Sequence, residues 1–121
     1  KNYKDLIAII GGVTFRGETV NSILLGLYDQ QNRLCYIGHA GTGKLSSEEW
    51  RKLTQNIRPL IIEKMPFSNK PERFKEAIWT RPEITVKIKY IEWPQGHNLR
   101  QPSIQAFVDI PPDECSFEEQ L

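Results

Sequence analysis

The chain has 121 residues, 39% of them hydrophobic and 26% charged, which suits one soluble domain with its own hydrophobic core and excludes two. Its formal net charge is only +1, so any nucleic-acid surface must arise from local segregation of charge. No apolar run approaches the roughly 20 residues that span a bilayer, and we expect no membrane partner.

The first part of the chain predicts a small, coiled β-sheet. Three apolar, β-branched segments are expected to be strands: residues 6–13, 22–29 and 34–40. The first strand ends at Gly11-Gly12, which indicates a bend or a bulge there. The polar residues 14–19 are predicted to form a loop, and residues 30–33 have the length of a hairpin turn. Glycines inside the strands, at Gly26 and Gly38, favour a tightly coiled sheet.

One amphipathic helix is predicted to begin near Ser47. Ser46 and Glu49 have the spacing of a capping box, in which each residue bonds the backbone of the other. Apolar residues follow at helical spacing: Trp50, Leu53, Ile57 and Leu60. Pro59 should end or kink this helix, because proline lacks the N–H that a helix interior needs.

Two further strands are expected after the helix, at residues 84–93 and 99–107. The apolar phase of the first slips by one after Tyr90, which predicts a bulge or a bend within one continuous strand. Pro102 places the second at a sheet edge. Three strands, a helix and two strands predict an all-β fold with one helix, namely a five-stranded OB-fold Greek-key barrel with the helix between strands 3 and 4. This fold hosts several functions and does not decide among them.

The domain organisation is expected to be simple. Residues 1–108 should form the OB-fold domain, and the acidic residues 109–121 a tail or a linker to a following domain. Because the chain opens without Met, we expect a fragment of a longer polypeptide. Cys35 and Cys115 form no C-x-x-C pair, so reduced thiols in a cytoplasmic protein and no metal site are expected.

Several motifs resemble the C-terminal OB domain of ATP-dependent DNA ligases. They occur in the family's order: residues 11–14 (GGVT), 22–28 (SILLGLY), 36–43 (YIGHAGTG), 79–83 (WTRPE), 90–93 (YIEW) and 99–103 (LRQPS). The resemblance is strongest to bacterial ligases of non-homologous end joining, the ligase D type. It runs from Lys1 to about Phe107, and the motifs are specific as a series rather than singly.

The resemblance implies what this chain does and does not contain. In the family a nucleotidyltransferase domain precedes the OB domain, and Lys1 resembles the final lysine of its last conserved element, which implies a cofactor-binding role. The adenylated lysine lies upstream in a K-x-D-G motif, and no K-x-D-G occurs here. The fragment should therefore have no catalytic residue and be inactive, while ATP and Mg²⁺ act in the parent enzyme.

The family's final motif, R-x-D-K, orients pyrophosphate during enzyme adenylation. By alignment it should fall at residues 108–111, where this sequence has Val108-Asp109-Ile110-Pro111. Neither Val108 nor Pro111 is a cation. Either other basic residues stabilise the pyrophosphate in this ligase, or the enzyme is weak at self-adenylation.

The candidate DNA-binding residues are Arg16, Thr42, Gly43, Lys44, Arg81, Lys87, Lys89 and Arg100. Arg16 and Arg100 resemble positions of the family, and Arg100 could contact either DNA or the nucleotidyltransferase domain. Several of these residues have a plainer interpretation. Arg16 suits a solvated loop, Arg81 can pair with Glu83, and the lysines on one polar strand face can serve solubility. The tryptophans are interpreted as structural, since a duplex offers no unstacked base to an aromatic ring.

The sequence therefore predicts a duplex-DNA-binding OB domain of an ATP-dependent DNA ligase, which helps to encircle and position nicked DNA during double-strand break repair. The expected partners are nicked or broken duplex DNA, the upstream nucleotidyltransferase domain and a Ku-type end-binding protein. The expected location is the bacterial cytoplasm, associated with the nucleoid. The alternatives are a single-strand-binding OB module, which should expose aromatics on its sheet face, and a protein-binding OB module.

Overall fold

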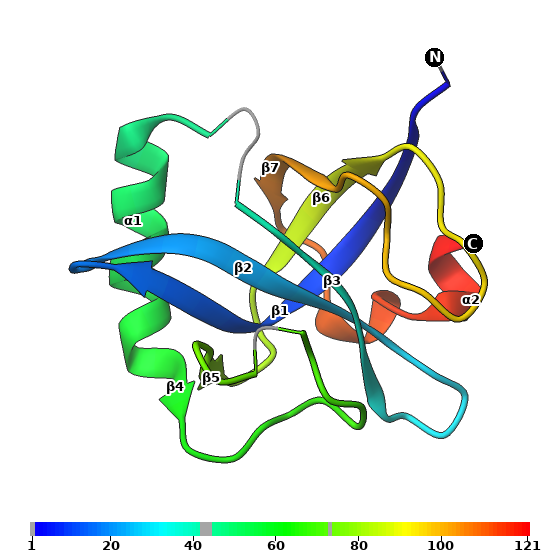
Figure 1. The fold of residues 1–121 in the computed structure, drawn as a ribbon, viewed down its shortest axis with the longest axis horizontal. Helices are drawn as coiled ribbons and strands as arrows, with labels where there is room; N and C mark the ends of the chain where they lie inside the picture. Colours follow the sequence, from blue (N-terminus) through cyan, green and yellow to red (C-terminus); the bar gives the residue numbers. More distant parts are fainter. Residues whose placement is uncertain (1, 42–44, 73) are drawn as a thin grey trace.

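A computed structural model describes residues 2–41, 45–72 and 74–121. Within these ranges the chain forms one antiparallel sheet of seven strands, with α1 (Ser47–Ile57) against it (Figure 1). The strands are β1 (Lys4–Arg16), β2 (Thr19–Tyr28), β3 (Leu34–Ala40), β4 (Ile61–Ile62), β5 (Ile78–Thr80), β6 (Thr85–Tyr90) and β7 (Ser103–Val108). Two 3-10 turns, η1 (Arg58–Leu60) and η2 (Pro112–Glu114), and the short helix α2 (Phe117–Gln120) complete the fold. No helix in these ranges is long and apolar enough to cross a membrane.

The long strand β1 organises the sheet. Its second half pairs with β2, while its opposite edge pairs first with β6, over Lys4–Ile9, and then with β5. The register with β2 shifts between Ile10 and Gly12, so the bulge predicted at the glycines is confirmed. Among the described residues β3 and β7 form no ladder, and a hydrogen bond from Leu99 N–H to Ile37 O (2.8 Å) links the two sides. The result is the predicted OB-type layout as an unclosed sheet.

Two strand predictions need correction. Residues 14–19 are not a loop: β1 continues to Arg16 and β2 begins at Thr19, so only Gly17-Glu18 remain as the turn, with Gly17 at φ +65°. Polarity misled here, because the Thr14 hydroxyl is buried and hydrogen-bonded to that of Ser22. The predicted strand 84–93 is not continuous either, since β6 ends at Tyr90. The bend predicted where the apolar phase slips is confirmed, because the chain bends at Ile91.

Two very short strands, β4 and β5, were also not expected. They pair with each other, and β5 pairs with β1 at Gly12 and Val13, just beyond the bulge. Their lengths of two and three residues give no readable alternation of apolar and polar side chains. The five longer strands and the helix occur in the predicted order, although β1 and β2 are longer than predicted, and β6 and β7 are shorter, with β7 beginning at Ser103 and not at residue 99.

The helix α1 begins and ends as predicted. Both halves of the capping box are present: Glu49 N–H donates to Ser46 Oγ (3.2 Å) and Ser46 N–H to Glu49 Oε1 (3.0 Å). The helix ends at Ile57, and Pro59 lies in η1. Leu53 and Ile57 are buried against the barrel, so α1 covers its core at one end.

Two glycines in the strands are needed because an aromatic ring packs on them, and not because their backbone is unusual. Phe67 is buried across β1 and β2, with its ring over Gly11 and Gly26. A Cβ atom at Gly11 would lie 2.5 Å from Phe67 Cζ, and one at Gly26 would lie 2.9 Å from Phe67 Cε1. The segment after β4 therefore packs onto the sheet only because these positions lack side chains.

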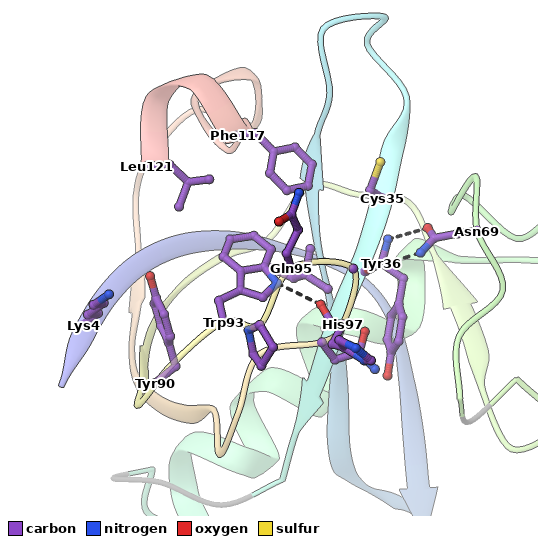
Figure 2. A pocket seen from close by; sticks show the side chains of 14 residues that line it. Lys4, Cys35, Tyr36, Asn69, Tyr90, Trp93, Gln95, His97, Phe117 and Leu121 are labelled. Carbon is purple, nitrogen blue, oxygen red and sulfur yellow. Dashed lines mark hydrogen bonds between the residues drawn. The ribbon is translucent and has the colours of Figure 1, made fainter. Parts of the chain in front are cut away.

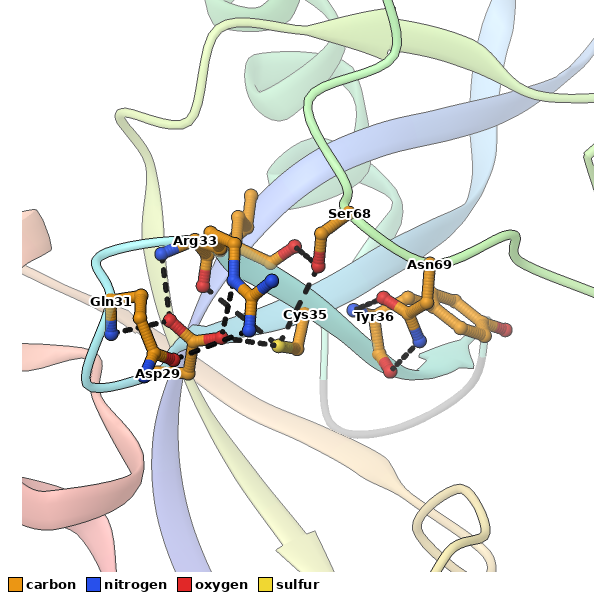
Figure 3. Close-up of polar contacts among 8 residues, drawn as sticks. Asp29, Gln31, Arg33, Cys35, Tyr36, Ser68 and Asn69 are labelled. Atoms are coloured by element: carbon orange, nitrogen blue, oxygen red, sulfur yellow. Dashed lines mark hydrogen bonds and ion pairs between the residues drawn. The ribbon is translucent and has the colours of Figure 1, made fainter.

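The β2–β3 turn and the outer edge of β3 are held by polar side chains (Figure 3). The pKa of the Asp29 carboxyl is lowered by the hydrogen bond that it accepts from Arg33 N–H, and further by the Arg33 guanidinium and by Gln31 N–H. Asn69 lies beside β3, where its Oδ1 accepts from Tyr36 N–H (2.7 Å) and its Nδ2 donates to Tyr36 O (3.2 Å). One side-chain amide thus takes the place of a paired strand.

The C-terminal segment packs against the barrel at the end away from α1 (Figure 1). Tyr28 N–H donates to Cys115 O (2.8 Å), and Ile7 N–H donates to Gln120 Oε1 (2.8 Å). These bonds place the segment between β1 and β2, where the two strands no longer pair. Cys115 is fully buried, and burial raises the pKa of its thiol to about 12. That residues 109–121 lead to a further domain stays a prediction.

Candidate nucleic-acid interface

A cavity of about 470 Å³ lies between the end of the β1–β2 hairpin and the first half of α1. It is lined by Arg16, Thr19, Val20, Asn21, Gly41, Ser47, Trp50 and Arg51. Arg16 is exposed at the end of β1, and Arg51 is exposed on α1. The structure thus brings a predicted DNA-binding arginine beside a second arginine that was not singled out from the sequence.

The hairpin tip is fixed against the helix end. Arg58 Nη2 donates to Glu18 O (2.8 Å), and its guanidinium lies 5.3 Å from the centroid of the Phe15 ring. Val20 N–H donates to Thr54 Oγ1 (3.0 Å), which ties β2 to the middle of α1. Because hairpin and helix are joined at these points, the positions of Arg16 and Arg51 are set by the fold.

The two arginines of this cavity are unneutralised. Within the described ranges neither Arg16 nor Arg51 has a carboxylate partner within 4.0 Å. Glu49, in the first turn of α1, is engaged by the capping box instead. Two exposed guanidiniums that face one concavity are suited to a phosphate group, which their fork of N–H donors matches in geometry.

The predicted lysines lie elsewhere, on β6. Val86, Ile88 and Tyr90 are buried, while Lys87 is exposed and Lys89 half-buried, as the alternation predicts. Lys87 Nζ is 4.0 Å from Asp5 Oδ2 on β1, and Lys89 Nζ lies 5.1 Å from the centroid of the Tyr3 ring. Both lysines therefore have partners, although such exposed contacts are weak and exchangeable.

The other two predicted arginines form exposed ion pairs. Arg81 Nε is 3.1 Å from Glu83 Oε2, and Arg100 Nη1 is 3.9 Å from Glu92 Oε2. Arg100 is also held through its backbone, since its N–H donates to Glu92 O (2.9 Å). These arginines lie in the connections before β6 and before β7, outside the cavity of Arg16.

The remaining predicted positions lie outside the described residues. They are Lys1, Thr42, Gly43 and Lys44. Gly41, which directly precedes the last three, lines the cavity of Arg16 and Arg51. Arg51 was missed because it stands on an exposed helical face without a motif, and its position beside the hairpin follows from packing alone.

The segment aligned with the family's final motif carries no cation. Val108 ends β7, and Thr85 Oγ1 lies 2.9 Å from Val108 O and 3.1 Å from Ile110 O. The buried hydroxyl of Thr85 thus holds the backbone of this turn. The side chains of residues 108–111 include no cation that could bind an anion. In the described part of the chain no cluster of His, Cys, Asp and Glu side chains is placed to hold a metal ion.

Comparison with known proteins agrees with this fold. Residues 16–109 match the family described as ATP dependent DNA ligase C terminal region. The multifunctional non-homologous end joining protein LigD of Mycolicibacterium smegmatis is 31% identical over 107 residues, which cover 85% of this chain and 14% of that protein. LigD of Mycobacterium tuberculosis H37Rv, a multifunctional non-homologous end joining DNA repair protein, is 30% identical over 109 residues, with the same coverage. The chain thus spans 14% of the length of these relatives.

Solved structures show the same relationship. The ligase domain of Mycobacterium tuberculosis LigD superposes with a TM-score of 0.85 at 29% identity, covering 95% of this chain and 39% of that one. A mycobacterial DNA ligase D complexed with ATP and MES superposes with a TM-score of 0.81 at 30% identity, covering 95% of this chain and 38% of that one. The chain therefore belongs to the family of C-terminal regions of ATP-dependent DNA ligases.

Proposed function

We propose that this chain binds duplex DNA within a larger ATP-dependent ligase of the end-joining type and holds a nicked or broken duplex against the nucleotidyltransferase domain. The observation that carries the proposal is the cavity lined by Arg16 and Arg51, two exposed arginines that have no carboxylate partner within the described ranges. Phosphate contacts of this kind position a protein on DNA without reading its sequence.

The distribution of charge supports the proposal. All 16 lysines and arginines precede residue 109, whereas five of the 15 acidic residues follow residue 108. Residues 1–108 therefore carry 16 positive against 10 negative charges, a net charge of +6 that the total of +1 conceals. An excess of this size attracts a polyanion over several ångströms and is screened by salt.

The chemistry of sealing would belong to the parent protein. ATP and Mg²⁺ act there, and a Ku-type protein is a candidate partner at the DNA end. The described residues contribute cations and close surface contact, and no K-x-D-G lysine is present to accept AMP. Incubated with radiolabelled ATP and Mg²⁺, the chain should form no adduct that survives denaturation, and a labelled band would contradict this division of roles.

Neighbouring residues on α1 provide a matched test. Arg51 lines the cavity with Arg16, whereas Lys52 lines a different cavity together with Glu49 and Phe107. Both are exposed, and replacing either with alanine removes one positive charge. We expect Arg16→Ala/Arg51→Ala to weaken duplex binding about 10-fold and to flatten the dependence of log K on log[salt] by about 2, since each phosphate contact contributes about 0.9.

The control and the lysines complete the experiment. Lys52→Ala should leave both the affinity and the salt slope almost unchanged. Lys87→Ala/Lys89→Ala should also flatten the slope, by less than 2, because Asp5 and Tyr3 already engage these side chains. If Arg51→Ala and Lys52→Ala weaken binding equally, the cavity is not a contact site. If the salt slope of Lys87→Ala/Lys89→Ala equals that of the wild type, these two lysines serve solubility and not DNA binding.

A further inference from the structure

A second cavity, of about 610 Å³, lies at the opposite end of the barrel, between β3, residues 93–98 and the C-terminal segment (Figure 2). Its volume is within the range of roughly 300–1,000 Å³ that is typical of small-ligand sites. Four aromatic side chains from three parts of the chain line it: Tyr36, Tyr90, Trp93 and Phe117. An aromatic lining of this kind is suited to a flat ring.

The indole of Trp93 is fixed in the wall of this cavity. Its Nε1 donates to His97 O (3.0 Å), and Tyr90 meets it edge-on, with centroids 6.3 Å apart and planes at 80°. Phe117 stacks on the indole with centroids 5.6 Å apart and planes at 25°. Phe117 thus lies near-parallel to the ring, as a stacked base would.

The rim of the cavity carries groups that match the other parts of a nucleotide. The side-chain amides of Gln95 and Asn98 have no hydrogen-bond partner among the described residues, and each offers donors and an acceptor. Gln95 is drawn near both Trp93 and Phe117 in the lining of the cavity (Figure 2). Lys4, also in the lining, is exposed and supplies a positive charge for a phosphate.

The cover over this ring is lightly held. The helix α2 is a single turn near the end of the described chain, Phe117 is only half-buried, and Leu121 is 72% exposed. Cys115, by contrast, is fully buried. Short segments with few buried contacts open at small free-energy cost, so this turn can move while Cys115 stays in place, once the hydrogen bond from Ile7 N–H to Gln120 Oε1 is released.

The C-terminal segment that covers Trp93 resembles a nucleotide in its chemical groups. Phe117 offers a flat ring, and Glu118 and Glu119 beside it are exposed and negatively charged. An aromatic ring next to anions imitates a base next to phosphates. A DNA strand and this segment would therefore compete for the same place on the barrel.

We propose that this cavity binds one unpaired base of a DNA strand, stacked on Trp93, when Phe117 moves away. The inference rests on the proposed DNA-binding function, and it adds a preference for DNA that presents an unpaired nucleotide. It also gives Trp93 a role that the sequence interpretation did not, because the ring was then considered only against intact duplex.

The test uses the 121-residue chain and two DNAs: a blunt duplex, and the same duplex with a three-nucleotide single-stranded overhang that contains 2-aminopurine. We expect the chain to bind the overhang DNA more tightly and to quench the 2-aminopurine fluorescence, since stacking quenches this base. Phe117→Ala should strengthen overhang binding by about 2- to 12-fold, the value of the aromatic pair that it removes, and leave blunt-duplex binding unchanged.

A matched control is Phe74→Ala. Phe74 is another partly exposed phenylalanine, 38% exposed, and it packs on Trp79 outside the cavity. Phe74→Ala should change the affinity for neither the blunt nor the overhang DNA. Trp93→Leu should remove the preference for overhangs, a loss of roughly 5- to 150-fold if one stacked base is lost. If Trp93→Leu does not fold, as judged by circular dichroism, the quenching and the two phenylalanine variants decide the question.

The outcomes separate the two proposals. Loss of blunt-duplex binding altogether would refute the proposed function. Normal blunt-duplex binding with equal affinity for overhangs and no quenching would refute the unpaired-base site alone. Stronger binding of an RNA overhang than of a DNA overhang, or no response to Phe117→Ala, would also overturn it.

Discussion

The two ends of the barrel differ in how their cavities are built. At the α1 end, Arg16 and Arg51 face a concavity that the hairpin and the helix leave open. At the other end, Tyr90 and Trp93 face a concavity that the C-terminal segment covers with Phe117. One end presents uncompensated positive charge, and the other presents aromatic surface under an acidic segment.

This difference shows that the number of cations in a region does not decide how available they are. Of the five predicted DNA-binding cations that the structure describes, four have partners: Lys87 with Asp5, Lys89 with Tyr3, Arg81 with Glu83 and Arg100 with Glu92. Arg16, at the α1 end, has no such partner within the described ranges. Of the predicted cations that the structure describes, Arg16 is therefore the one that a phosphate can reach without displacing a partner.

The largest effect should come from removing the C-terminal end. Deleting residues 112–121 removes the buried Cys115, the Phe117–Trp93 stack and the hydrogen bond that Gln120 accepts from Ile7. We expect the free energy of unfolding to fall by about 3–5 kcal/mol and the Tm by roughly 10 °C or more. Differential scanning calorimetry measures this. Arg16→Ala/Arg51→Ala should stay within about 2 °C of wild type, and an unchanged Tm for the deletion would remove the contrast between the ends.

A change in the middle of the barrel should affect both ends alike. Gly11→Ala forces a Cβ against the Phe67 ring, so we expect a loss of about 1–3 kcal/mol in urea unfolding. Phe67→Leu should make the alanine better tolerated, which a double-mutant cycle detects as less-than-additive loss. Affinity for blunt and overhang DNA, measured on the folded fraction, should not change. A selective effect on one cavity would show that Gly11 does more than make room.

The buried thiol of Cys115 provides a probe of the C-terminal segment at alkaline pH. The pKa of Cys115 is raised from 9.0 to about 12, so the folded protein binds this proton more tightly than the unfolded chain. Its contribution to stability is present in full below pH 9 and is lost as pH rises from 9 towards 12, with a slope of up to about 1.4 kcal/mol per pH unit. Urea unfolding at pH 8 and pH 10 should show this loss in wild type and not in Cys115→Ala.

A thiol reagent checks the same assignment independently. Half-exposed Cys35 should react in the native protein at pH 8, whereas Cys115 should react only after unfolding. Two reactive thiols in the native state would mean that the C-terminal segment is already open.

The smallest effect should come from freeing one paired arginine. Glu83→Gln removes the carboxylate 3.1 Å from Arg81, and the stability should change by less than about 0.5 kcal/mol, because both side chains are about half exposed. Duplex affinity at low salt should rise about 2-fold, since Arg81 no longer has a competing anion. An unchanged duplex affinity would argue that the ion pair with Glu83 does not limit DNA binding by Arg81. The comparison between the two ends of the barrel would then rest on cavity shape alone.

The helix α1 could be predicted from the sequence because local signals determine it, whereas the end of the hairpin beside it was wrongly predicted as a loop. The capping residues Ser46 and Glu49 and the proline at position 59 fixed the bounds of the helix, and β3 was predicted with its observed bounds. Alternation of apolar and polar residues likewise placed Lys87 on the outer face of β6. Each of these signals involves residues close together in the chain.

The other end could not be predicted, because contacts between distant residues build it. Gln120 meets Ile7 across 113 residues, and Phe117 meets Trp93 across 24. No period or motif in residues 109–121 announces these contacts, and five acidic residues indicate an exposed tail. Arg51 was missed for a similar reason, since only packing brings the helix beside Arg16.

The amide of Asn69 has a consequence for self-association. β3 is the last strand in its direction across the sheet, and the edges of sheets are where chains add to one another and aggregate. Asn69 engages both the N–H and the C=O of Tyr36, and Ser68 N–H donates to Leu34 O (2.7 Å) on the same edge. A neighbouring molecule thus finds these groups already engaged. We therefore expect this single carboxamide to oppose association of two molecules through the β3 edge.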